Sequence, residues 1–219
     1  YDEKRWSSLE WVMKKVRLLV GSKNRKKAAE IARLLSGLPV QVVSLADSPG
    51  DLPAAKEEAE DFLKNAEAKA LHYASQTGLL CVADDSGLCV EALGGEPGVR
   101  SARYAGPEQD DAANIRKLLA KLRGKRGSER SAYFVCAVAL AEPERVIFSL
   151  ISSCYGQITD APRGEGGFGY DPVFVPEGER RTFAQMRPEE KDAISHRGRA
   201  FRAFLKEFRK FLLRRGLIQ

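Results

Sequence analysis

Apolar residues recur with two different spacings along this chain, and the order of those spacings predicts its secondary structure. A short Val- and Leu-rich run at residues 16–20 has the composition of a buried strand. Helical spacing follows, up to a predicted stop at Gly37, in the apolar residues Ala28, Ile31, Leu34 and Leu35. Another apolar run, at residues 40–45, predicts a second strand. The chain therefore opens with a strand, a helix and a strand.

The longest helical pattern runs from about Ala54 to Gln76, with Gly78 as its stop. Its apolar face consists of Ala59, Phe62, Leu63, Ala66, Ala70 and Tyr73. The apolar run at residues 79–83 then predicts a strand that leads into Asp84-Asp85-Ser86-Gly87. Because Asp, Ser and Gly are typical turn residues, a turn directly after this strand is the simplest structural interpretation of that sequence.

The second half of the chain predicts another helix and a long β-hairpin. Residues 110–124 have helical spacing, and two β-branched and aromatic runs at 131–140 and 145–158 are separated by a short polar stretch. Residues 159–176 are too rich in Gly and Pro for a regular element, and such a long loop in a compact domain is usually functional. Alternating strands and helices followed by a hairpin predict an α/β fold, with a mixed twisted sheet flanked by helices.

A single domain is the expected organisation. The chain has 219 residues, which one α/β domain can cover, and no linker or internal repeat divides it. We assign residues 13–219 to that domain, because Met13 stands just before the first strand in the manner of a natural start. Residues 1–12 are interpreted as an N-terminal extension or an expression remnant.

Composition narrows the function classes. No apolar run reaches the roughly 18 residues of a membrane-spanning helix, and the N-terminus lacks the apolar core of a secretory signal. The four cysteines form no Cys-x-x-Cys pair, and we expect buried free thiols in a cytoplasmic protein. Only two histidines are present, far apart in the sequence, which argues against a histidine-built metal site.

The C-terminal segment 197–215 holds eight Lys or Arg and one Glu, a charge of +7 in a chain whose net charge is +6. Helical spacing recurs in its apolar residues Phe201, Phe204, Leu205, Phe208, Phe211 and Leu212. We expect an amphipathic helix that packs this stripe on the core and leaves its cations in solvent. Contact with a membrane surface or a nucleic acid is the alternative, although aromatic residues on the apolar stripe do not favour base stacking.

Residues 22–27, with the sequence SKNRKK, lie between the first strand and its helix. Backbone N–H groups at a helix N-terminus attract anions, and Ser22, Asn24 and Lys27 add a hydroxyl, an amide and an ammonium group. The segment therefore predicts a phosphate-binding turn. A capped helix with solvated lysines is the alternative interpretation.

Carboxylates are concentrated at two places. Asp84 and Asp85 follow a predicted strand, and the acidic segment 56–61 opens the predicted long helix that leads to it. Mg²⁺ binds one or two carboxylates together with substrate phosphates and water, so the Asp pair and a Glu from this segment would suffice. Acidic residues in a first helical turn are also favoured by the helix dipole alone.

Two later segments could recognise a base. In residues 164–172, glycines allow close approach of a ligand, Phe168 and Tyr170 offer aromatic faces, and Asp171 offers an acceptor for an N–H group. Residues 189–198 supply cations for phosphate or a keto oxygen, together with a histidine that by itself is more commonly structural.

Together these segments resemble a known family. The sequences ADDSGL, ALGGEPGVRSARYAG, GGFGYDPVF and EEKDAISHRG follow a Ser-x-Asn-x-x-Lys stretch in the order of the inosine triphosphate pyrophosphatase family, and the resemblance covers residues 14–210. It implies an active-site cleft between two lobes and a homodimer. It also implies Mg²⁺-dependent hydrolysis of ITP, dITP and XTP to the monophosphate and pyrophosphate, which removes damaged nucleotides from the pool.

The resemblance also implies residue roles. Asp85 corresponds to the catalytic acidic residue, and Asp85, Asp84 and Glu57 to metal ligands, with Glu58 as the neighbouring alternative to Glu57. Substrate binding is implied for Ser22, Lys23, Asn24, Arg25, Lys26, Lys27, Ser86, Phe168, Gly169, Tyr170, Asp171, Lys191, His196 and Arg197. A donor from His196 or Arg197 to a 6-keto oxygen would favour inosine and xanthosine over adenine.

Two positions depart from the family pattern. Lys64 stands where the family has Glu in its Phe-x-Glu-Asn-Ala helix motif, and Lys23 stands where it has Gly in Thr-Gly-Asn. A nucleotide-binding regulatory module without turnover is therefore one alternative function, and a basic nucleic-acid-binding protein is another. The intact Asp84, Asp85 and Lys27 favour the enzyme, for which we expect no membrane partner and no stable nucleic-acid partner.

Overall fold

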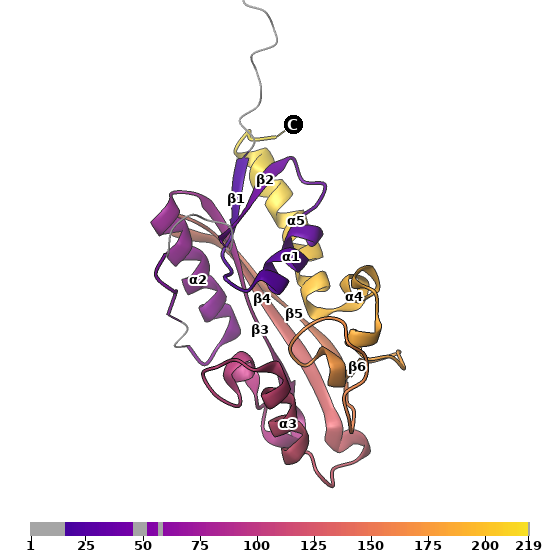
Figure 1. Ribbon diagram of the computed structural model, residues 1–219. Coiled ribbons are helices and arrows are strands. Elements are labelled where there is room, and N and C mark those ends of the chain that lie inside the picture. The colour runs from indigo at the N-terminus through magenta and orange to yellow at the C-terminus, as the bar shows by residue number, and fades with distance from the viewer. Residues whose placement is uncertain (1–15, 46–51, 57–58, 219) are drawn as a thin grey trace, which may run out of the picture.

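The computed structural model describes residues 16–45, 52–56 and 59–218, so the N-terminal extension and Glu57 with its neighbour Glu58 lie outside the described residues. These residues contain one six-stranded sheet in the order β2-β1-β3-β4-β5-β6 (Figure 1). Its strands are β1 Val16–Val20, β2 Val40–Ser44, β3 Leu80–Val90, β4 Ser131–Glu142, β5 Arg145–Ile158 and β6 Phe174–Pro176. The α-helices are α1 Arg25–Leu34, α2 Phe62–Thr77, α3 Asp111–Lys121, α4 Pro188–Ile194 and α5 His196–Arg214.

The sheet is mixed, as predicted. Strand β1 is parallel to both of its neighbours, β2 and β3, whereas the pairs β3-β4, β4-β5 and β5-β6 are antiparallel. Strand β1 ends at Val20, opposite Val82, but β3 continues to Val90. Beyond Val82, β1 therefore no longer covers that edge of β3. This uncovered edge is the part of β3 that carries the two aspartates.

The two faces of the sheet differ because successive strand residues point to opposite sides. On β4, Ala137, Ala139 and Ala141 belong to the buried cluster that contains α2, and their small side chains let this helix lie close. The intervening Cys136 and Val138 belong to the cluster that contains α1 and α5. Figure 1 accordingly shows α2 on one side of the long strands and α1 with α5 on the other.

The predicted amphipathic helix at the C-terminus is confirmed. Helix α5 buries Phe201, Phe204, Phe208 and Leu212 completely against the sheet and α1. Its cations beyond Arg197 are exposed. The four cysteines are buried free thiols, also as predicted. Within the described ranges, no helix has both the length and the apolar character that a bilayer span requires.

The prediction that the long helix begins near Ala54 is wrong. Helix α2 begins at Phe62, with Asp61 as its N-cap, whose carboxylate accepts a hydrogen bond from the Lys64 backbone N–H. The Asn65 side chain donates to the backbone oxygen of Ala59 and accepts from its N–H, at 2.9 and 3.1 Å. These hydrogen bonds satisfy the backbone groups of Ala59 outside a helix. The side-chain contact therefore outweighs the helical composition of this segment.

The prediction of a turn at Asp84-Asp85-Ser86-Gly87 is also wrong. Strand β3 passes straight through these residues, because Asp84 pairs with Val138 and Asp85 with Ala137 on β4. Gly87 allows close packing of the backbone and does not form a turn. A Cβ atom at Gly87 would lie 2.4 Å from the carbonyl oxygen of Gly98, in the 3₁₀ helix η3 Gly98–Arg103.

Helices α4 and α5 meet at an equally close contact. Ser195 caps α5 by accepting from the Gly198 N–H at 3.1 Å. A Cβ atom at Gly198 would lie only 1.8 Å from the backbone oxygen of Asp192, in α4. The sequence Ser-His-Arg-Gly thus brings two helices together at the point where His196 and Arg197 enter the core.

This contact predicts the sign of a mutation. In an unconstrained helix, Gly198→Ala would stabilise by up to about 1 kcal/mol. Here the new methyl group overlaps a backbone oxygen, and we expect a loss of about 1–3 kcal/mol in the free energy of unfolding in urea. Ala203→Gly, at an exposed position of the same helix, is the matched control and should cost only about 1 kcal/mol. Stabilisation by Gly198→Ala would contradict the close contact.

Candidate active site

A cavity of about 370 Å³ opens where β1 ends beside the uncovered edge of β3. Most of the predicted site residues line it, namely Ser22, Lys23, Asn24, Lys27, Asp85, Ser86, Phe168, Gly169, Tyr170, Asp171, Lys191, His196 and Arg197. Arg25 and Lys26 are exposed on the first turn of α1 and do not line this cavity, and Asp84 is buried behind its wall. The structure thus brings four distant sequence segments to one place.

The turn before α1 is fixed by its own polar side chains. The Ser22 hydroxyl accepts from the Asn24 N–H at 3.3 Å, and the Asn24 side chain caps α1 by accepting from the Lys27 N–H at 3.0 Å. No acidic residue lies in the first turn of α1, so the positive end of the helix dipole is not neutralised there. This end of the cavity is suited to an anion.

Lys23 fits this turn although it replaces a family glycine. Its ammonium donates to the backbone oxygen of Leu52 at 2.8 Å. Among the described residues, Gln109 is the one non-glycine residue with a positive φ, so the backbone at Lys23 does not require glycine. The other departure, Lys64, is exposed on α2 and does not line the cavity.

Strand alternation separates the two adjacent aspartates. Asp84 points to the α1 and α5 side, where its carboxylate lies 3.3 Å from the Lys27 ammonium and 3.2 Å from the Arg197 guanidinium. Asp85 points to the α2 side, where Asn65 donates to it at 3.1 Å and the Lys69 ammonium lies at 3.8 Å. Only Asp85 lines the cavity. The two neighbouring carboxylates therefore lie in two different environments.

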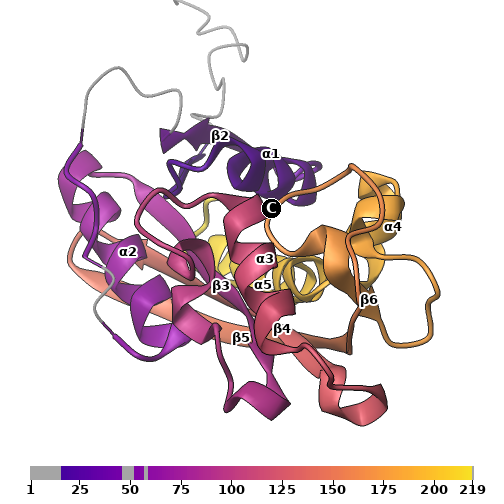
Figure 2. The same cartoon turned by 60° about the horizontal axis from the view of Figure 1, so that its bottom comes forward.

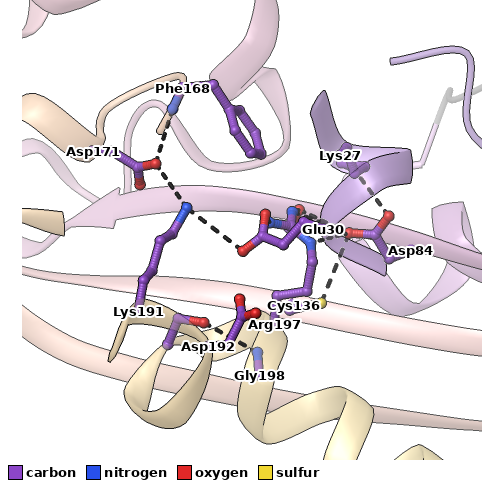
Figure 3. Close-up of polar contacts among 12 residues, drawn as sticks. Lys27, Glu30, Asp84, Cys136, Phe168, Asp171, Lys191, Asp192, Arg197 and Gly198 are labelled. Atoms are coloured by element: carbon purple, nitrogen blue, oxygen red, sulfur yellow. Dashed lines mark hydrogen bonds and ion pairs between the residues drawn. The ribbon is translucent and has the colours of Figure 1, made fainter. Parts of the chain in front are cut away.

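Buried charges hold Asp84 ionised. Complete burial alone would raise the pKa of Asp84, but the charges of Lys27 and Arg197 outweigh it and hold the pKa well below its ordinary value. Arg197 is itself 2% exposed and also donates to Glu30 at 2.8 Å. Burial would raise the pKa of Glu30 too, yet Arg197 and Lys191 lower it. Figure 3 shows this cluster, together with the Cys136 thiol beside Asp84.

The same network reaches the glycine-rich loop. Lys191 lies 3.6 Å from Glu30 and 2.7 Å from Asp171, whose carboxylate also accepts from the Phe168 N–H at 2.9 Å (Figure 3). Burial raises the pKa of Asp171 by more than Lys191 lowers it. The Phe168 ring lies over the Lys191 ammonium, 4.9 Å from centroid to nitrogen. The aromatic ring of Phe168 thus lies against the buried charges of Lys191 and Asp171 at this end of the cavity.

His196 is neutral at this end. Its ring stacks on Phe134 at a centroid distance of 4.5 Å and an angle of 8°, and its Nδ1 atom has no hydrogen-bond partner. Burial, followed by the nearby charge of Arg197, lowers the pKa of His196 well below its ordinary value of 6.5. A buried, unpartnered ring nitrogen in a cavity wall is suited to a hydrogen bond with a ligand.

Sequence reasoning missed three buried polar residues of this site, Glu30, Asn65 and Lys69. Helical spacing places two of them beside other site residues, but it does not by itself indicate that they are buried. Glu30 follows Lys27 by one helical turn, and Lys69 follows Asn65 in the same way, so each lies on the face of its partner. Charged residues at such positions are normally solvated, and the sequence gives no reason to bury them.

A preformed metal cage is not found in the described parts of the chain, where no three or more His, Cys, Asp or Glu residues converge. Asp85 remains a hard oxygen donor on a cavity wall, with cations and a helix N-terminus nearby. Mg²⁺ commonly binds to one or two carboxylates while keeping substrate phosphates and water as its other ligands. Asp85 fits this mode of binding.

Fold and site define an α/β protein whose cavity has one end suited to an anion and one end suited to a base. Residues 18–207 match the Ham1 family. Similar proteins include the dITP/XTP pyrophosphatase of Streptomyces coelicolor, 46% identical over 198 residues that cover 90% of this chain and 98% of that protein. The dITP/XTP pyrophosphatase of Nocardia farcinica is 50% identical over 196 residues, covering 88% and 95%.

Solved structures agree. A HAM1 protein from Coxiella burnetii has a TM-score of 0.77 and 41% identity, covering 89% of this chain and 99% of its own. The nucleoside-triphosphatase / dITP/XTP pyrophosphatase of Mycobacterium abscessus has a TM-score of 0.67 and 49% identity, covering 87% and 99%. The chain belongs to the Ham1 family, and the family resemblance predicted from its motifs is confirmed.

The environment of His196 predicts how stability depends on pH. In the unfolded chain His196 takes up a proton near its ordinary pKa of 6.5, whereas the folded protein keeps it neutral. Folding stability therefore falls as the pH drops below that value, by about 1.4 kcal/mol per pH unit for one proton. In His196→Gln, the free energy of unfolding should fall less steeply between about pH 6.5 and 5.5. Equal slopes would contradict a neutral buried imidazole.

Proposed function

We propose that this chain hydrolyses the non-canonical purine nucleoside triphosphates ITP, dITP and XTP to the nucleoside monophosphate and pyrophosphate. The observation that carries this proposal is one cavity that is lined by Lys27 and the N-terminus of α1, by Asp85 and by Phe168. The named activity of the relatives supports it. The enzyme is a hydrolase of phosphoric anhydrides that removes damaged nucleotides from the pool.

The triphosphate binds at the α1 end. A nucleoside triphosphate carries several negative charges, and a nucleophile reaches phosphorus only after these are partly neutralised. Ser22, Asn24 and Lys27 line this end of the cavity, and Lys69 stands across from them on α2. Arg25 and Lys26 point outward and contribute to the long-range attraction of the substrate.

Asp85 would hold Mg²⁺ together with phosphate oxygens, with Glu57 from the acidic segment as the proposed second ligand. The ion supplies charge neutralisation at the phosphates and lowers the pKa of bound water. Asp84 stays a candidate ligand on the family pattern, but its carboxylate already pairs with Lys27 and Arg197. We assign Asp84 chiefly the role of a buried counter-ion that fixes these two cations.

In the reaction, water forms a bond to the α-phosphorus and the bond from that phosphorus to the oxygen of the leaving pyrophosphate breaks. Asp85 orients the attacking water and accepts its proton. Asn65 fixes the Asp85 carboxylate from one side, and the Lys69 ammonium lies at 3.8 Å on the other. Two side chains of α2 thus hold the reacting carboxylate in place.

The base lies beside Phe168, at the end of the cavity that Lys191 and His196 also line. The Nδ1 atom of His196 has no partner in the protein, so it is our first candidate for contact with the base. Arg197 already donates to Glu30, Asp84 and Ser86, so we assign it a positioning role. An adenine base would place an amino group where a keto oxygen is required, and buried polar groups would be left unpaired.

Assembly, domain limits and location are further proposals. We propose a homodimer, as the family resemblance implies. Residues 13–219 are proposed as one domain, since one continuous sheet and one family match span most of that range. Cytoplasmic residence fits the four buried free thiols and a nucleotide substrate. The alternative of a nucleic-acid-binding helix gains no support from α5, because Phe201, Phe204 and Phe208 are buried.

The test is pyrophosphate release from ITP, dITP, XTP, GTP and ATP in the presence of Mg²⁺. We expect turnover of the first three and little with ATP. Asp85→Asn should lower the turnover number at least about 100-fold, because the proton acceptor is lost. Its thermal unfolding serves as the control and should stay close to that of the wild type. Orthophosphate instead of pyrophosphate as the product, or full activity in Asp85→Asn, would contradict the proposal.

A further inference from the structure

The loop that carries Phe168 is attached to the rest of the protein from two directions. In the buried part of the site, Asp171 pairs with Lys191. The buried Tyr170 hydroxyl also donates to the backbone oxygen of Ser101, at 2.9 Å. Across the cavity, the Gly169 N–H donates to a carboxylate oxygen of Asp111 at 2.8 Å. Figure 2 shows this loop, in orange, running beside α3. The bond to Asp111 is the exposed attachment.

Asp111 links two elements that line the cavity. It is the first residue of α3, it is 58 residues distant from Gly169 in the sequence, and both residues line the cavity. Gly169 has a φ of 60°, a conformation that glycine adopts without strain. The contact therefore adds a direct link from α3 to this loop, beside the bond that Tyr170 makes to Ser101.

The N-terminus of α3 does not need Asp111 as its cap. The preceding Asp110 already accepts from the N–H groups of Ala112 and Ala113, at 2.8 and 3.2 Å. The carboxylate of Asp111 instead reaches to the backbone of the facing loop. Two adjacent aspartates at one helix end thus have separate tasks, one within the helix and one across the cavity.

We propose that Asp111 is a positioning residue for nucleotide binding, which holds the Phe168 loop in the form that receives the base. The proposal rests on the proposed function. A charge-assisted hydrogen bond to one backbone N–H restrains the loop before the substrate arrives, and a restrained loop loses less entropy on binding. Asp111 acts through Phe168 and makes no contact with the reacting phosphate. Its loss should therefore weaken binding and leave the chemical step unchanged.

The experiment compares Asp111→Ala, Asp111→Asn and the matched control Asp110→Ala. Steady-state kinetics with dITP and amide hydrogen exchange of Gly169 are measured for each variant and for the wild type. In Asp111→Ala we expect a KM about 5- to 30-fold higher, a kcat within about twofold of the wild type, and faster exchange at Gly169. Asp111→Asn retains an acceptor oxygen and should restore most of both properties.

The control separates positioning from helix stability. Asp110→Ala removes the side-chain cap of α3 and should lower the temperature of thermal unfolding, whereas KM and the exchange of Gly169 should change much less than in Asp111→Ala. Equal effects of Asp110→Ala and Asp111→Ala would overturn the proposal, as would an unchanged KM and exchange rate in Asp111→Ala. Failure of the wild type to bind and hydrolyse dITP would instead refute the proposed function on which the inference rests.

Discussion

A buried guanidinium between two buried carboxylates is the constraint on which the rest of this structure depends. Arg197 from α5 donates to Glu30 of α1 and to Asp84 of β3, and all three side chains are almost completely excluded from solvent. Each charge would be costly alone, because the low-dielectric interior does not replace its hydration. Removing one of the three charges would therefore leave the others buried without that partner, so the packing of the three elements depends on the charges as a set. Lys27 and Lys191 extend the same network to the two ends of the cavity.

The position of the chemistry follows from strand geometry. Strand β3 runs past the end of β1, so its middle residues have an edge without a neighbouring strand. Since adjacent strand residues face opposite sides, Asp84 enters the charged core and Asp85 enters the cavity wall. Two identical side chains thus acquire different tasks from one backbone conformation. Adjacent residues of one sequence motif can in this way have different roles, one in stability and one in reactivity.

Most regular elements could be predicted from the sequence, because periodicity reports burial directly. The strand at 16–20, the hairpin and the C-terminal helix all follow it. Local composition predicted the wrong structure where a tertiary contact determines the backbone conformation. The segment before Phe62 has helical composition, but the Asn65 side chain satisfies its backbone in another form. Turn residues at 84–87 form a strand, because pairing with β4 outweighs their local preference.

The candidate site, too, could be predicted only in part from the sequence. Its convergence at one cavity could be expected from four motifs in order, and the lining residues include most of those predicted. Glu30 and Lys69 could not be identified, since a charged residue on a helix is normally solvated, and only the opposing charges from other elements make burial acceptable. The contact of Asp111 with Gly169 depends on the approach of helix α3 to the glycine-rich loop, which no sequence spacing encodes.

The most direct measurement of the central claim is the free energy of unfolding of Arg197→Met beside the triple variant Glu30→Gln, Asp84→Asn, Arg197→Met. Removing Arg197 alone takes away the one cation that two buried carboxylates share and should cost about 3–5 kcal/mol. Neutralising all three groups should recover about 2 kcal/mol or more of that loss, since buried triads can often be replaced by neutral side chains. A cost below about 1 kcal/mol for Arg197→Met, or a triple variant less stable than the single one, would contradict the account.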